Sequence, residues 1–168
     1  SNADEKIDAF IILNSDNSNL DTNFFYLSGI TSGVFEGCAI IGHKNGKGHL
    51  LTSQLEEPIA SKETKLKISV FEKRDERKEQ IKELLSDTNT LGINGKNISY
   101  KNFKSIKKLT KAKIVDISDA FSKTRSIKDK NEIKLVSKAC KISSRVASEF
   151  PAYVKSSVTE KQLSKTLL

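Results

Sequence analysis

Residues 37–52 read GCAIIGHKNGKGHLLT, and this stretch decides the fold. Two apolar runs, residues 37–43 and 48–52, lie on either side of Asn45-Gly46. Asn-Gly readily adopts the positive φ angles of a type I′ turn, which joins two antiparallel strands without splaying them. The stretch therefore predicts a β-hairpin.

Strand and helix patterns alternate on both sides of this hairpin. Residues 8–13 (DAFIIL) form a short apolar run of the buried-strand type, and a polar loop follows at 14–21. We expect further strands at 66–71, 90–93 and 112–117, and helices at 53–62, 74–85 and 99–109. Ser53 and Ser99 are expected to cap the first and last of these helices. The order predicts an α/β fold of the ribonuclease-H-like type, a mixed β-sheet flanked by helices, antiparallel at first and parallel later.

The pattern changes after about residue 120. We expect an α/β domain at 4–122 and a linker at 123–128. From Asp129 the apolar residues recur at helical spacing, and Glu132 stands three positions later, as a capping box requires. A second capping pattern begins at Thr159. Because that second helix stops soon after it starts, we expect the sequence to be cut and residues 129–168 to be helices of a missing partner domain.

Composition limits the classes of protein to which the chain can belong. It has 168 residues, 36% of them hydrophobic and 30% charged, which suits one soluble domain with a core. No apolar run approaches the roughly 20 residues of a membrane span, so we expect no membrane partner. Cys38 and Cys140 each have apolar neighbours, which favours two buried thiols in a cytoplasmic protein over a disulfide or a thiolate metal site.

The net charge of +8 is concentrated in the second part of the chain. Residues 1–98 carry 12 Lys/Arg and 15 Asp/Glu, whereas residues 99–168 carry 17 and 6. Only four of the 29 basic residues are arginine, the side chain that nucleic-acid-binding proteins mostly use to contact phosphates and bases. We therefore expect no nucleic-acid partner. The lysines from Lys101 to Lys113 indicate a solvated helix face or a surface for an acidic partner.

Three motifs together resemble one family. Residues 125–133 (RSIKDKNEI) resemble the inter-domain junction of the creatinase, prolidase and aminopeptidase P family, where the pattern is roughly Arg-x-Ile-Lys-Ser-x-x-Glu-Ile. Residues 23–29 (NFFYLSG) resemble its Asn-x-x-Tyr-Leu-Thr-Gly element. Residues 158–160 (VTE) resemble the Thr-Glu helix start early in its catalytic domain. Asp129 stands where that family usually has serine, and both residue types are good N-caps.

The resemblance implies the N-terminal, non-catalytic α/β domain of a metal-dependent Xaa-Pro aminopeptidase or dipeptidase. In that family a C-terminal pita-bread domain holds a dinuclear centre of manganese, cobalt or zinc, which activates the hydroxide that cleaves the bond before proline. None of those ligands matches a residue of this chain, so we expect no catalytic residue, no metal-binding residue and no activity in the chain alone. The resemblance further implies proline-containing peptides as substrates of the whole protein, and a homodimer.

The resemblance also implies that the N-terminal domain narrows access to the active site. The candidates for contact with substrate are Asn23, Tyr26 and Gly29. Each has a structural alternative. Asn23 can tie down its own loop, Tyr26 can be a half-buried aromatic residue with a satisfied hydroxyl, and Gly29 can serve a tight turn.

Two other functions stay open at this point. A ribonuclease-H-like nuclease would hold two metal ions with carboxylates, and the chain offers Asp8, Glu56, Glu57 and Asp116. The other possibility is a non-enzymatic protein-interaction module of the same architecture, as in relatives that have lost the metals.

Overall fold

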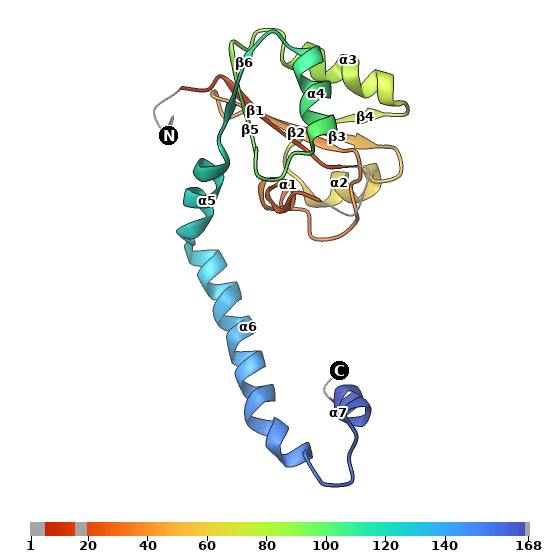
Figure 1. The fold of residues 1–168 in the computed structure, drawn as a ribbon, viewed down its shortest axis with the longest axis vertical. Helices are drawn as coiled ribbons and strands as arrows, with labels where there is room; N and C mark the ends of the chain where they lie inside the picture. The colour runs from red at the N-terminus through yellow and green to blue at the C-terminus, as the bar shows by residue number, and fades with distance from the viewer. Residues whose placement is uncertain (1–5, 16–19, 167–168) are drawn as a thin grey trace. The chain divides into compact units, whose positions relative to one another are not determined.

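The computed structural model describes residues 6–15 and 20–166, and these divide into two compact units between Thr124 and Arg125. The first unit is an α/β domain, and the second consists of helices (Figure 1). The strands are β1 (Ala9–Leu13), β2 (Ala39–His43), β3 (Gly48–Ser53), β4 (Lys67–Phe71), β5 (Thr90–Ile93) and β6 (Lys113–Asp116). The helices of the α/β part are α1 (Thr22–Ser28), α2 (Glu57–Glu63), α3 (Arg74–Leu84), α4 (Tyr100–Leu109) and α5 (Ser118–Ser126).

The six strands form one mixed sheet in the order β4-β3-β2-β1-β5-β6. The strand β2 is antiparallel to both β1 and β3, whereas the pairs β1–β5, β5–β6 and β3–β4 are parallel. The predicted hairpin is present: Gly42 pairs with Gly48, and the turn places Gly46 at a φ of 81°. The expected fold, antiparallel first and parallel later, is therefore confirmed.

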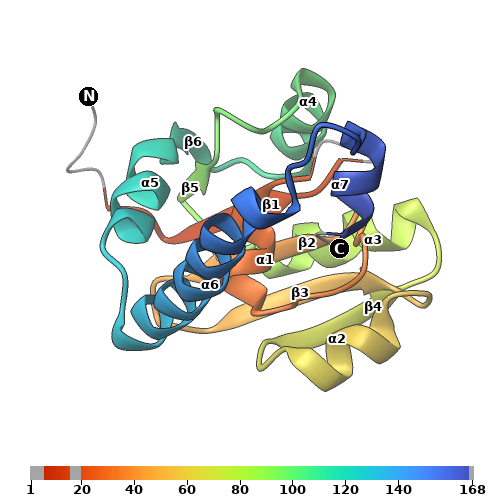
Figure 2. The same cartoon turned by 90° about the horizontal axis from the view of Figure 1, so that it is seen from below.

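Helices cover both faces of this sheet. Figures 1 and 2 show α1 and α2 on one face and α3 and α4 on the other. The side chains of β1 alternate between the two faces. On one face Phe10 packs against Phe121 of α5 with ring centroids 5.6 Å apart, and its ring covers its cross-strand neighbour Gly42, where a Cβ would collide with it. The core on both faces is apolar and closely packed, with Ile11, Ile12 and Leu91 fully buried.

Some expected element bounds were wrong. The helix α2 begins at Glu57 rather than at Ser53, and its N-cap residue Glu56 makes no side-chain cap bond. Pro58 lies in the first turn of α2, where a missing N–H costs no helical hydrogen bond. We expected no helix at α1 or α5, and residues 123–126 of the expected linker form the last turn of α5. Ser99 does cap α4, because its hydroxyl accepts from the backbone N–H of Asn102 at 3.2 Å.

The second unit contains α6 (Lys130–Glu149), a 3-10 helix η1 (Phe150–Tyr153) and α7 (Glu160–Thr166). Both predicted helix starts are confirmed. Asp129 accepts from the N–H groups of the first turn while Glu132 accepts from the Asp129 N–H at 2.8 Å, and Thr159 begins α7 with a capping pattern. The expectation of two buried thiols was wrong: Cys38 is buried, but Cys140 is exposed on α6, which has no buried residue in the described chain. Among the described helices, none has the length and apolarity that crossing a bilayer requires.

Candidate functional site

The helix α1 is a seven-residue helix with a defined cap at each end. Asp21 precedes it in extended conformation, and its carboxylate accepts from the backbone N–H of Asn23 at 2.9 Å. Gly29 follows it with a φ of 73°, and its N–H donates to the Phe25 carbonyl. This left-handed conformation strains any residue other than glycine, so the Asp-x-Asn spacing and the final glycine together determine where α1 begins and ends.

A largely buried polar network surrounds the Asp21 carboxylate, with Asn97 as its exposed member. We call it the Asp21 network, and it consists of Asn14, Asp21, Asn23, Asn94 and Asn97. One carboxylate oxygen accepts from the side-chain amides of Asn23 at 2.9 Å and Asn97 at 3.2 Å. The other accepts from the Asn94 amide at 2.7 Å. Asn14 completes the network by accepting from the Asp21 N–H at 3.1 Å. The donors from Asn23, Asn94 and Asn97 offset the cost of burying the Asp21 carboxylate.

The Asp21 network lies at a particular place in the sheet. Asn14 follows the carboxyl end of β1, and Asn94 follows the carboxyl end of its parallel neighbour β5. The helices that come after these two strands, α1 and α4, lie on opposite faces of the sheet (Figures 1 and 2). Open α/β sheets commonly bind ligands at such a switch point. Here buried side chains occupy that position.

The three predicted contact residues differ in their surroundings. Asn23 is only 6% exposed, and both its backbone N–H and its amide donate to Asp21, which agrees with the structural alternative for this residue. Tyr26 is 40% exposed on α1. Gly29 is exposed and forms the helix cap. The structure places all three on or beside α1, and their contact with substrate stays a prediction.

The segment after α1 has an unusual backbone. This α1–β2 loop, residues 29–38, contains four positive φ angles, at Gly29, Gly33, Phe35 and Gly37. Phe35, at a φ of 54°, is the one described non-glycine residue with a positive φ. Its side chain is fully buried, and its ring centroid lies 5.6 Å from that of Phe24. A strained residue persists only where its surroundings hold it, so this loop is a candidate functional segment.

Two glutamates from the region of α2 hold this loop. Glu63 accepts from both the backbone N–H and the hydroxyl of Thr31, at 2.7 and 2.9 Å, and from the Ser32 hydroxyl at 2.7 Å. The bond from the Thr31 N–H is the main cause that lowers the pKa of Glu63. Glu56 accepts from the Phe35 N–H at 2.9 Å. Val34, at 50% exposure, is therefore presented to solvent on a loop whose backbone is fixed on both sides of it.

Sequence reasoning missed this role of Glu56 and Glu63. From the sequence, Glu56 is a carboxylate of the nuclease alternative or an ordinary acidic residue of a first helical turn, and no pattern marks Glu63. These carboxylates bind backbone groups more than 20 positions away in the chain. No local pattern encodes such a contact. The cluster of glycines at 29, 33 and 37 was the available signal that the loop needs positive φ angles.

The carboxylates of the nuclease alternative are not brought together. Asp8 lies at the amino end of β1, where it accepts from the N–H groups of Asn89 and Thr90, whereas Asp116 ends β6. Because β1, β5 and β6 are parallel, these two carboxylates lie at opposite ends of the sheet, separated by about 10 Å or more. No group of three or more metal-ligating His, Cys, Asp or Glu side chains occurs within residues 6–15 and 20–166. The described residues therefore do not fit a metal centre.

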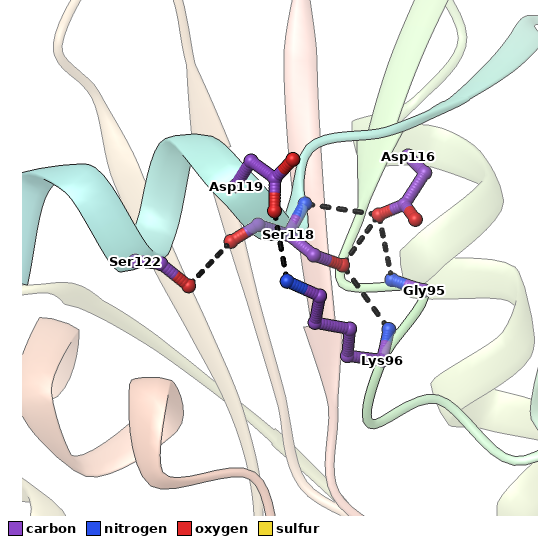
Figure 3. A network of polar contacts seen from close by, with 6 residues as sticks. All are labelled: Gly95, Lys96, Asp116, Ser118, Asp119 and Ser122. Atoms are coloured by element: carbon purple, nitrogen blue, oxygen red, sulfur yellow. Dashed lines mark hydrogen bonds and ion pairs between the residues drawn. The ribbon is translucent and has the colours of Figure 1, made fainter. Parts of the chain in front are cut away.

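Asp116 instead joins the ends of β5 and β6 (Figure 3). Its carboxylate accepts from the N–H of Gly95 at 3.0 Å and from the N–H of Ser118 at 2.9 Å, and the Ser118 hydroxyl also donates to it. Desolvation raises the pKa of Asp116, but these donors outweigh it, so the pKa lies below its ordinary value. Lys96 donates to Ser118 through its backbone and pairs with Asp119 at 2.8 Å. The Asp116 carboxylate therefore has a structural role at the start of α5.

Comparison with known proteins gives one consistent result. The Creatinase/Prolidase N-terminal domain family model matches residues 2–127. An Xaa-Pro dipeptidase of Pyrococcus furiosus is 36% identical over 126 residues, which cover 73% of this chain and 33% of that protein. The chain therefore spans about a third of this curated relative.

Solved structures agree with the family match. The X-Pro aminopeptidase from Thermotoga maritima has a TM-score of 0.81 and 26% identity, over 96% of this chain and 45% of its own. The prolidase from Pyrococcus furiosus has a TM-score of 0.71 and 28% identity, over 96% of this chain and 44% of its own. The fold, the motifs and these matches agree, and the chain belongs to the creatinase/prolidase N-terminal domain family.

Proposed function

We propose that this chain is the N-terminal part of a metal-dependent Xaa-Pro peptidase, where its α/β domain limits which substrates reach the active site. Three relatives support the peptidase: an Xaa-Pro dipeptidase, an X-Pro aminopeptidase and a prolidase. The whole protein would act on proline-containing peptides as a cytoplasmic homodimer. Its dinuclear manganese, cobalt or zinc centre would be held by residues outside this chain, because the described residues do not fit one.

The fixed α1–β2 loop is the observation that carries the proposed role. A surface that selects substrates by size has to keep its shape when a long peptide presses on it. The glutamates Glu56 and Glu63 hold the loop backbone on both sides of Val34. The aromatic side chain of Phe35 anchors the same loop in the core. The loop and the half-exposed Tyr26 therefore suit a rigid wall against which substrate is excluded.

Residues 129–168 would be the first helices of the peptidase domain. The match to both solved enzymes covers 96% of this chain and so extends beyond the α/β domain. We assign the hydrolytic step to the remainder of that domain. The α/β domain contributes sterically, and none of its side chains needs to take part in bond cleavage.

The first experiment asks whether the chain hydrolyses peptides by itself. The purified 168-residue chain is incubated with an Xaa-Pro dipeptide and added Mn²⁺ or Co²⁺, and the release of proline is measured. We expect no turnover above the rate without protein. Turnover that follows the chain through purification would contradict the assignment of the chemistry to residues outside it.

The second experiment tests the access role in the complete protein. Tyr26→Ala is compared with Tyr100→Ala, which removes an exposed tyrosine on the other face of the sheet. Tyr26→Ala is expected to raise kcat/KM for a longer proline peptide relative to an Xaa-Pro dipeptide, because a wider opening admits larger substrates. The control should leave that ratio unchanged. An unchanged ratio for Tyr26→Ala as well as for a Val34→Gly variant would refute the access role.

A further inference from the structure

One helix face remains unexplained by the proposed function. The helix α4 and the turn after it carry five exposed lysines, which we call the α4 lysine surface: Lys101, Lys104, Lys107, Lys108 and Lys111. The opposite side of α4 holds the buried Ile106 and the partly buried Phe103 and Leu109. The lysines thus follow the outer side of an amphipathic helix, on the sheet face opposite α1 and α2 (Figures 1 and 2).

These five lysines are gathered on a stretch of chain that offers them no acidic partner. Residues 99–113 contain no aspartate or glutamate. Some other lysines of the α/β domain do form close ion pairs, as in Lys44–Asp8 at 2.7 Å and Lys78–Asp75 at 2.6 Å. Across the described ranges, no ion pair involves any of the five lysines of the α4 surface. The acid-rich helix α3 packs against α4. In the described ranges, its carboxylates form no ion pair with these five lysines.

The spacing of the lysines makes the face self-repulsive. Lys101, Lys104 and Lys108 stand three or four positions apart on α4, so each is a neighbour of the next on the helix surface. Like charges at this spacing destabilise a helix, and a bound polyanion would relieve that repulsion. The Nζ of Lys104 lies 5.1 Å from the centroid of the Tyr100 ring, which is itself 74% exposed. One aromatic ring therefore belongs to the same surface.

We propose that the α4 lysine surface binds an extended acidic segment of a partner protein. From Lys101 to Lys108 the lysines span about 10 Å along α4, and neighbouring ones on the helix surface are about 5–6 Å apart. In an extended chain, side chains on one side recur about every 6.6 Å. An acidic residue at every second position can therefore meet successive lysines of the surface.

Two other polyanions fit this surface less well. No arginine lies between residues 99 and 113 to grip a phosphate with two parallel bonds, and a convex helix offers no groove for a nucleic-acid strand. A membrane-binding helix needs several exposed apolar side chains, whereas Tyr100 is the one large hydrophobic residue exposed on α4. The carboxylates of an acidic protein segment therefore match these lysines better than a nucleic acid or a membrane does.

Fluorescence anisotropy tests the proposal with the full 168-residue chain. The probe is a labelled peptide of about twelve residues in which glutamate and serine alternate. The test variant changes Lys101, Lys104 and Lys108 to glutamine. The matched control changes Lys44, Lys78 and Lys82 to glutamine, which removes the same charge from lysines that have acidic partners. Circular dichroism checks that both variants fold, which is expected because all six side chains are on the surface.

We expect binding at low salt that weakens as salt rises, and a loss of about tenfold or more in the test variant. The control variant should change binding by no more than about twofold. Absence of binding by the unmodified chain at low salt, or equal losses in both variants, would overturn the proposal. Tighter binding of a thymine oligonucleotide of similar length, or of phosphatidylserine vesicles, would overturn it in favour of that partner. None of these readouts depends on peptidase activity, so failure here leaves the proposed function untouched.

Discussion

Replacing Asp21 with alanine tests whether the Asp21 network holds the carboxyl ends of β1 and β5 together. The change removes the acceptor shared by three side-chain amides, those of Asn23, Asn94 and Asn97. Asn23 and Asn94 are each 6% exposed, so water cannot easily replace the lost acceptor for these two. An unsatisfied buried polar group costs about 1–3 kcal/mol. With two such amides and the lost N-cap of α1, worth about 1 kcal/mol, the free energy of unfolding should fall by about 3–7 kcal/mol.

Urea unfolding followed by far-UV circular dichroism measures this change, since the chain has no tryptophan to serve as a fluorescent probe. Asp75→Ala is the matched control, because its carboxylate is exposed and pairs with Lys78 within its own helix. The free energy of unfolding of the control should stay within about 0.5 kcal/mol of that of the unmodified chain. The loss of unfolding free energy for Asp21→Asn should lie between the losses for the control and for Asp21→Ala. Its amide NH₂ would face one of the amides that now donate to the carboxylate. A loss below about 1 kcal/mol for Asp21→Ala would refute the claim that this network organises the fold.

Three further predictions concern single residues. Gly95→Ala should destabilise the fold by about 1–3 kcal/mol in urea unfolding, since the new Cβ would collide with the Asp116 carboxylate. Burial lowers the pKa of His49 in the folded chain. As pH falls below about 6.5, His49 therefore binds a proton more readily in the unfolded chain than in the folded chain. The urea midpoint should therefore drop between pH 7.5 and 5.5, and His49→Gln should reduce that drop. Glu63→Gln weakens the acceptors that hold the α1–β2 loop, so the Thr31 amide should exchange its hydrogen several-fold faster at neutral pH.

The parts of the fold that the sequence predicted are those encoded by neighbouring residues. Asn45-Gly46 specifies its turn within four positions, and the strands on either side follow from it. Asp129 and Glu132 likewise complete their capping box within a single helical turn. In each case the donors and acceptors that satisfy one another are close in the chain, so reading the local pattern was enough.

The candidate site depends on pairings that local patterns do not contain. Asp21 binds amides at positions 94 and 97, more than 70 residues away. In the sequence Asp21 reads as one more polar residue of the loop at 14–21, and only the parallel pairing of β1 with β5 brings these groups together. The exposure of Cys140 has the same kind of cause. Its apolar neighbours predicted burial, but burial depends on what packs against α6, and a single helix does not specify that.

The position of the Asp21 network also bears on where this domain can act. In an open α/β sheet, the place for a small ligand is outside the carboxyl ends of adjacent parallel strands whose following helices diverge. That place exists here, between β1 and β5, but Asn14, Asp21 and Asn94 fill it and satisfy one another. A ligand entering there would have to break several buried hydrogen bonds and leave a carboxylate without its donors. The sheet therefore serves as a rigid support, and Asn14, which also donates to the Phe35 carbonyl, ties the α1–β2 loop to it. The contacts that we propose for substrate and for an acidic partner accordingly use exposed side chains, those of the α1–β2 loop region and of the α4 lysine surface.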